Sequence, residues 1–222
     1  MQGGMTEPDY LQPTRFIDSG EPAVRAFAQN AVKGIAGDQA RAIALYYAVR
    51  DGVAYDPYLD YTDPDLFRAG AVLSGRRGFC AGKSSLLAAS ARAVGIPARV
   101  GFADVRNHLN SKRLRELVEG DTFFWHSYTE IKIDGAWVKC TPAFDRELCA
   151  RARIAPLEFD GAHDSLFHPF DAAGRRHMEY LNDRGGFEDV PVAAILADFN
   201  RLYPKLIANG KTGGNFRAEV AS

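Results

Sequence analysis

Residues 76–99 read RRGFCAGKSSLLAASARAVGIPAR, and this stretch predicts a helix that begins at a cysteine. After a polar turn, apolar residues recur at the spacing that places side chains on one helix face: Leu86, Leu87, Ala91 and Val94. Gly95 and Pro97 predict the end of the helix, because glycine tolerates the left-handed conformation and proline cannot continue a helix. The turn therefore delivers Cys80 to a helix N-terminus.

A cysteine in this position has the environment of a nucleophile. Unpaired N–H groups and the positive end of the helix dipole favour the thiolate, which is the form that attacks carbonyl carbons. The same N–H groups can hold the oxyanion that forms on attack. We therefore expect the pKa of Cys80 to lie below about 8.5, the value of a free thiol. The alternative is a small buried packing residue, as most free cysteines are.

A histidine that can serve Cys80 lies downstream, in the segment FFWHSYTE at residues 123–130. Its alternation predicts a strand with His126 on one face and Trp125 on the other. Asp134 and Gly135 then form the strongest hairpin signal in the chain, which predicts a second strand from residue 136 to about residue 144. A distant histidine is the partner expected for a thiol nucleophile.

The predicted hairpin also indicates a third member of the site. With Asp134 and Gly135 as the turn, Asp145 lies on the His126 face as a diagonal neighbour. A carboxylate there can hold the imidazole in its productive tautomer. Cys140 falls on the opposite face, and we expect it to be a packing residue.

Composition excludes several classes of function. The chain has 222 residues with 46% hydrophobic and 25% charged residues, which is ordinary for a globular protein. A formal net charge of −1 argues against a nucleic-acid partner. No apolar run approaches the roughly 18 to 20 residues of a membrane span, and the first residues lack the features of a signal peptide, so we expect a cytoplasmic protein without a membrane partner. Cys80, Cys140 and Cys149 are too few for a disulfide framework.

Cofactor and metal sites find no support in the residue patterns. The remaining histidines, His108, His163, His168 and His177, show no pair at metal-ligand spacing. No glycine-rich loop follows a strand as a nucleotide site requires. We therefore expect no cofactor and no metal, and we interpret His163 and His168 as loop residues in polar contacts.

The rest of the chain predicts helices before Cys80 and mixed structure after it. Helices are expected from Pro22 to about residue 35 and from about residue 38 to Gly52, and a short helix or an excursion within residues 109–119; a strand is expected over residues 98–105, a turn within residues 178–186, and a last helix from Pro191. We divide the chain into an N-terminal segment (1–19), a catalytic core (20–150) and a C-terminal extension packed on it (151–222). The extension, including residues 158–171, either forms a wall of the catalytic cleft or covers the sheet elsewhere.

Four motifs together resemble the transglutaminase-like superfamily: Gly78-Phe79-Cys80, RAVGIPAR at residues 92–99, WHSYTE at residues 125–130 and GAWV at residues 135–138. The resemblance covers roughly residues 40–145. It implies a papain-like α+β fold, in which a cysteine at a helix N-terminus faces a histidine and an aspartate on antiparallel strands. It also implies a thioester intermediate whose acyl group passes to an amine or to water.

One position departs from that family pattern. The family usually places its acidic residue four positions after the hairpin tryptophan and directly before a proline, and here that position holds Thr141, before Pro142. The orienting role then falls to Asp145, to another carboxylate, or to none.

We accordingly predict a thiol-dependent enzyme that acts on a peptide, amide or other acyl substrate. Cys80 is the predicted nucleophile, His126 the general base and acid, and Asp145 the orienting residue. The alternative is a binding or scaffold protein that keeps the fold without the chemistry.

Overall fold

Helix α4 (Cys80–Ala93) is the centre of the fold. In this computed structural model its residues Cys80 to Arg92 are all buried, so the helix is enclosed on every side instead of burying one face as predicted. Small residues allow its neighbours to approach closely. A Cβ atom on Gly82, for example, would lie 2.6 Å from the carbonyl oxygen of Leu66. A helix enclosed on all sides holds its first residue, Cys80, at a fixed place in the interior.

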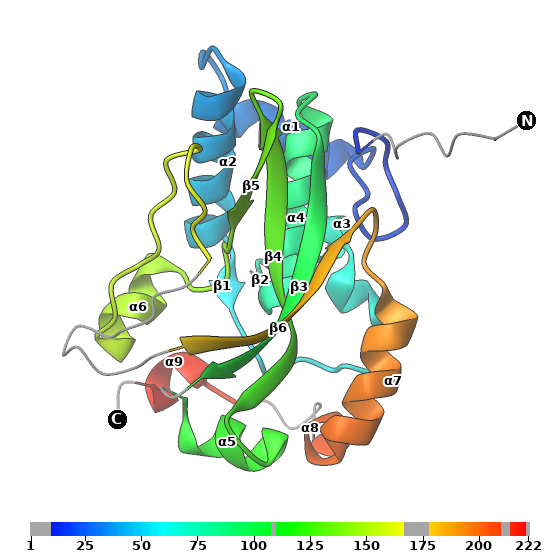
Figure 1. The fold of residues 1–222 in the computed structure, drawn as a ribbon, viewed down its shortest axis with the longest axis vertical. Helices are drawn as coiled ribbons and strands as arrows, with labels where there is room; N and C mark the ends of the chain where they lie inside the picture. The colour runs from blue at the N-terminus through cyan, green and yellow to red at the C-terminus, as the bar shows by residue number, and fades with distance from the viewer. Residues whose placement is uncertain (1–9, 108–109, 167–177, 210–213, 221–222) are drawn as a thin grey trace, which may run out of the picture.

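The structure describes residues 10–107, 110–166, 178–209 and 214–220 (Figure 1). Helices and strands alternate in a mixed α+β order, as the sequence predicts: α1 (Pro22–Ala31), α2 (Asp38–Gly52), β1 (Ala54–Tyr55), the 3-10 turn η1 (Pro64–Phe67), α3 (Ala69–Gly75), β2 (Arg77–Gly78), α4, β3 (Ala98–Asn107), α5 (Lys112–Val118), β4 (Thr122–Ile133), β5 (Ala136–Cys140), α6 (Arg146–Ala152), β6 (Met178–Phe187), α7 (Val192–Leu202), α8 (Pro204–Asn209) and α9 (Phe216–Glu219).

The main sheet is antiparallel and has the strand order β5-β4-β3-β6. Helix α4 packs against its two central strands, β3 and β4 (Figure 1). On the far side of α4 from the sheet lie α1, α2 and α3, which also contact it. The sheet and the helices thus bury α4 between them, and this is where the main core of apolar side chains lies.

The hairpin prediction is confirmed in its register. Glu130 pairs with Lys139, and Lys132 pairs with Trp137. The turn residues Asp134 and Gly135 have φ angles of 50° and 84°. Two left-handed residues in succession are what a two-residue hairpin turn with the twist of the strands requires.

One strand prediction and one turn prediction are wrong. Strand β5 ends at Cys140 and not near residue 144, because Pro142, the next residue that would face β4, has no N–H to donate. The outer edge of β5 forms a single parallel bridge with Ser165. The Thr141 N–H donates to the Ser165 carbonyl at 2.9 Å. Residues 178–187, predicted to contain a turn, form strand β6 on the other edge of the sheet. Register shifts relative to β3 accommodate the turn-forming residues of that segment as irregularities within the strand.

The helix predictions are confirmed for α1, α2 and α7, with Pro191 directly preceding α7, although α1 ends at Ala31 and not near residue 35. Of the two possibilities for residues 109–119, a short helix or an excursion, the structure has the helix α5. Strand β3 is confirmed and extends to Asn107. All three cysteines are free thiols. Among the described residues, no helix is both long and apolar enough to cross a membrane.

Candidate active site

Cys80 is the first residue of α4 and lies in the interior, with 8% of its surface exposed. Phe79, in extended conformation, precedes the helix and turns the chain into it. Backbone N–H groups of Ser127, Ala81 and Cys80 itself bond to the sulfur and lower the thiol pKa. Burial outweighs them and raises the pKa of Cys80 to about 11. The expected pKa below that of a free thiol is therefore reversed, because the thiolate loses more hydration than three N–H groups restore.

His126 lies on β4, next to the residue whose N–H reaches the Cys80 sulfur. Cys80 and His126 line one cavity together, so the structure brings these two predicted site residues to one place. The contact follows from the packing of α4 on β4, which sets the start of the helix against the middle of the strand. Two residues 46 positions apart in the sequence thereby become neighbours of one cavity.

A bulge in β4 lies beside His126. Ala103 of β3 pairs with His126, whereas Val105 pairs with Phe123, so β4 contains one extra residue between the two pairs. Trp125 within the bulge has a φ angle of 60°, a left-handed conformation that is rare for a bulky residue. The bulge breaks the alternation of side chains, and Trp125 lines the Cys80 cavity together with His126. The prediction that Trp125 lies on the other face is therefore wrong.

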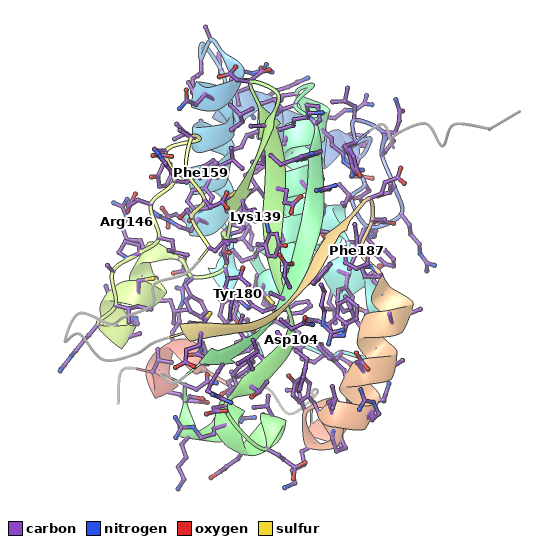
Figure 2. The ribbon with its side chains drawn as sticks, in the orientation of Figure 1. Asp104, Lys139, Arg146, Phe159, Tyr180 and Phe187 are labelled. Atoms are coloured by element: carbon purple, nitrogen blue, oxygen red, sulfur yellow. The ribbon has the colours of Figure 1, made fainter. Side chains whose placement is uncertain are left out.

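Charged groups hold this bulge in place. The Trp125 backbone N–H donates to Asp104 at 3.2 Å, and its indole N–H donates to Asp198 at 2.8 Å. Arg184 donates from Nε to Asp104 at 2.6 Å and lies over the Trp125 ring at 4.2 Å from its centroid. Asp104 lies where β6 crosses β3 (Figure 2). These contacts join β3, β6 and α7 around a strained residue, which is the kind of support that a left-handed tryptophan requires.

Asp145 does not form the predicted contact with His126 in any described hydrogen bond or ion pair. It lies beyond the end of β5 and caps α6, where its side chain accepts the Leu148 N–H at 3.0 Å. Its second oxygen accepts the Tyr55 N–H at 3.1 Å, and Arg217 pairs with the carboxylate at 2.9 Å. The assignment of Asp145 as orienting residue depended on a strand that continues past Cys140, and that strand ends there. The carboxylate instead joins α6, β1 and α9.

Thr141, at the acidic position of the family pattern, does share a cavity with His126. This second cavity lies away from Cys80 and is lined by the Thr141, Phe144 and Cys149 side chains among others. Thr141 is 4% exposed, and its hydroxyl oxygen has no hydrogen-bond partner. A buried hydroxyl without a partner is unfavourable, so its place beside His126 calls for an explanation.

The Cys80 cavity has a wall that the sequence did not predict residue by residue. Its lining is mainly aromatic, with Tyr55, Tyr61, Phe79, Phe123, Phe124, Phe199 and Tyr203 beside Trp125. Phe199 of α7, Leu206 of α8 and Tyr203 between the two helices line it, so the C-terminal region contributes to the cleft, as one of our two hypotheses held. The apolar face of the Pro191 helix was the available signal, but periodicity does not say which surface such a face covers.

Within residues 158–166, Leu166 lines the other cavity, and the rest of the segment to residue 171 falls outside the described residues. His163 bonds Asp160 at 2.8 Å in an exposed loop, as predicted. His108, His168 and His177 fall outside the described residues. Across residues 10–107, 110–166, 178–209 and 214–220, no group of three His, Cys, Asp or Glu side chains has metal-binding geometry.

A lysine lies buried one turn into α4. Lys83 donates to the carbonyl oxygens of Arg50 at 2.8 Å and Val53 at 2.6 Å. Burial lowers its pKa to about 7, against the opposing attraction of Asp145 and Asp51. The two bonds tie α4 to the end of α2 and fix the strand-like segment that carries Tyr55 to the cavity.

A cysteine at the start of a buried helix, packed on an antiparallel sheet that carries a histidine, defines the papain-like class of fold. Residues 25–142, more than half of the chain, match the transglutaminase-like superfamily, and the chain belongs to this family. The match contains Cys80, His126 and Thr141, whereas α7 and α8 lie beyond it.

A solved structure of a second protein shares this fold. A candidate cysteine protease from Cytophaga hutchinsonii is 20% identical, with a TM-score of 0.50, over 84% of this chain and 48% of that one. The present chain thus spans about half the length of that relative. The periplasmic domain of TgpA from Pseudomonas aeruginosa is 27% identical, with a TM-score of 0.42, over 60% of this chain and 45% of that one. A comparison with curated proteins found no match.

Proposed function

We propose that this protein is a cysteine-dependent enzyme that transfers or hydrolyses an acyl group through a thioester on Cys80. One observation carries the proposal: the Cys80 sulfur lies at the start of a buried helix, accepts the Ser127 N–H, and shares its cavity with the adjacent His126. A packing cysteine requires neither a histidine in its cavity nor N–H groups directed at its sulfur. The family relation and its cysteine-protease relative support the same class of chemistry.

The proposed reaction begins with the transfer of the Cys80 thiol proton to His126. The sulfur attacks the acyl carbon of an amide or ester, forming the C–S bond, and the carbonyl oxygen becomes an oxyanion. When the oxyanion collapses, the bond to the leaving group breaks, and His126 returns the proton to the leaving amine or alcohol. Water or a second amine, deprotonated by His126, then attacks the thioester and regenerates the thiol.

Backbone N–H groups are the candidates to stabilise the oxyanion. Those of Cys80, Ala81 and Ser127 bond to the sulfur in the resting site. Once the thiolate formed by proton transfer has attacked, the sulfur carries no negative charge, so these donors become available to the oxygen that develops beside it. Preorganised donors of this kind contribute about 3 to 4 kcal/mol each to the transition state in enzymes where one has been removed.

We assign the position behind His126 to Thr141 and not to Asp145. Thr141 lines a cavity with His126, and its hydroxyl is unpartnered, whereas both Asp145 oxygens accept N–H groups elsewhere. A hydroxyl accepts from an imidazole N–H more weakly than a carboxylate does, since charge-assisted bonds are about twice as strong. We therefore expect a modest enzyme compared with one that has an acidic residue there.

The test of the proposal is covalent labelling. The protein is incubated with p-nitrophenyl acetate and its intact mass and digested peptides are measured, together with Cys80→Ser, Cys149→Ser and His126→Ala variants. We expect one acetyl group, on Cys80 only, that hydroxylamine removes, as thioesters require. Cys149→Ser should label normally and Cys80→Ser should not label at all. Equal acetylation of the three cysteines in folded protein would contradict the nucleophile assignment.

A second candidate function is a binding or scaffold protein. Thr141 at the acidic position and the raised pKa of the enclosed Cys80 favour it. In that case no Cys80 adduct forms, either in the parent protein or in the His126→Ala variant. The same experiment thus separates the two functions.

A further inference from the structure

The described residues that line the cavity beside Cys80 include no acidic side chain, lysine or arginine. Among these described lining residues, His126 and Cys80 are the titratable groups besides tyrosines. The indole N–H of Trp125 points away to Asp198, and the Tyr203 hydroxyl donates to the Thr122 carbonyl at 3.0 Å. The Tyr61 hydroxyl likewise donates to the Pro57 carbonyl at 3.0 Å. These three polar groups of the wall are thus engaged by the protein itself, and most of the remaining lining is apolar.

The aromatic wall is rigid because its rings pack on one another. Tyr61 lies edge-on to Phe79 with centroids 5.3 Å apart and to Phe199 with centroids 5.6 Å apart. Phe199 in turn contacts Tyr203 at 5.2 Å. Arrangements at these distances are favourable beyond the apolar area they bury. The cavity has a volume of about 50 Å³, which leaves room for a short group only.

We propose that this site accepts a short, uncharged, apolar acyl group, and that Phe199, Tyr203 and Leu206 set its length. The proposal rests on the thioester chemistry proposed above, because the nucleophile at the cavity identifies the occupant as the acyl part of the substrate. A carboxylate or ammonium at the end of that group would lose its hydration and meet no opposite charge on the described wall. The apolar lining that admits a terminal methyl group thus excludes a terminal carboxylate or ammonium.

The three specificity-determining residues come from α7, from α8 and from the residue between them, outside residues 25–142 that match the family. The nucleophile and histidine are therefore in the family region, and part of the acyl pocket is added by the C-terminal region. All three side chains are buried, with exposures of 5%, 3% and 5%. Shortening one of them enlarges the cavity without replacing Cys80 or His126, so the change should act on acyl length and leave the reacting groups in place.

Three p-nitrophenyl esters of equal chain length test the charge rule: the pentanoate, the hydrogen glutarate and the 4-aminobutanoate. The terminal methyl of the first is replaced by a carboxylate in the second and an ammonium in the third. Nitrophenolate release and the mass of the Cys80 peptide report acylation. We expect the pentanoyl group to transfer at least tenfold faster than either ion, and a rate within threefold for one ion would overturn the proposal.

Phe199→Ala tests the length rule, with Ile195→Ala as its control. Ile195 is buried on the same helix but does not line the cavity, so its variant reports packing loss alone. We expect Phe199→Ala to raise the ratio of octanoyl to pentanoyl transfer at least tenfold and Ile195→Ala to leave it within twofold. Equal ratios in the two variants would overturn the role of Phe199.

A binding measurement keeps the inference testable without acylation. In a Cys80→Ala, Trp137→Phe variant, Trp125 is the sole tryptophan and reports on the cavity by fluorescence. Pentanamide, glutaramic acid and 4-aminobutanamide are titrated against it. Binding of pentanamide that is tighter by tenfold or more supports the proposal even if no ester labels Cys80. The absence of labelling would then count only against Cys80 as the nucleophile. Equal binding of the three amides would overturn the acyl class even if Cys80 is acylated.

Discussion

Replacement of Asp145 distinguishes a structural carboxylate from a catalytic one. Asp145→Ala removes the cap of α6, which costs about 1 kcal/mol. It leaves the Tyr55 N–H without its acceptor, for about 1 to 2 kcal/mol more. Arg217 keeps Glu147 as a partner at 2.5 Å, so loss of its second pair adds less than about 1 kcal/mol.

Together these losses lower the free energy of unfolding by about 3 kcal/mol, which corresponds to a fall of about 6 to 12 °C in Tm for a chain of this size. Urea unfolding followed by circular dichroism measures the first quantity, and thermal unfolding the second. Glu147→Ala is the matched control, because it removes the other, exposed partner of Arg217 from the same helix. Its expected cost is below about 1 kcal/mol.

The Asp145→Asn variant tests whether Asp145 has a catalytic role. Asparagine caps a helix nearly as well as aspartate, so the variant should lose less stability than Asp145→Ala. If the role is structural, Cys80 acylation per folded molecule stays within about threefold of the parent. An Asp-to-Asn change in a triad aspartate lowers turnover by about 10⁴ in a well-studied serine protease. A hundredfold loss of acylation with unchanged unfolding free energy would refute our placement of Asp145.

Three further predictions concern titration and the third position. Burial raises the pKa of Cys80 to about 11, so its rate of alkylation by iodoacetamide should still be rising above pH 9; a plateau below pH 8 would mean that an unseen positive charge dominates. Cys149, whose pKa burial raises to about 12, should react more slowly. Burial lowers the pKa of Lys83 to about 7, whereas the unfolded chain has about 10.4. Between these two pKa values the unfolded state binds more protons, so the unfolding free energy should rise with pH from 7 to 8.5, by up to about 1.4 kcal/mol per pH unit. Urea titrations of the Lys83→Met variant should lack this slope. An equal slope in both proteins would mean that another group causes it. The Thr141 hydroxyl has no partner in the resting structure, so Thr141→Val should raise the unfolding free energy by about 1 kcal/mol. Under our proposal this hydroxyl accepts from His126 during the reaction, so the same change should slow Cys80 acylation; unchanged acylation would deny Thr141 a role behind His126.

The sequence was sufficient for features that local rules decide. Gly78 to Pro97 predicts the helix that begins at Cys80, because its start and stop signals lie within the segment itself. The register of the β4–β5 hairpin follows from Asp134 and Gly135, since a two-residue turn fixes every pair beyond it. With the register known, His126 becomes the partner to propose for Cys80, and both line one cavity.

The tertiary structure alone decided where these local rules stop. Beyond Cys140 the chain leaves β4, pairs on its outer edge with Ser165, 25 residues later, and brings Asp145 to cap a helix and to accept the Tyr55 N–H. The bulge at Trp125 requires support from β3, β6 and α7, so no pattern within β4 announces it. An amphipathic helix such as α7 reveals that it has an apolar face, but only packing against Tyr61 and Phe124 shows that this face closes the cavity of Cys80. Periodicity is a property of one segment, whereas the partner of a face depends on the shape and volume that the rest of the chain leaves open.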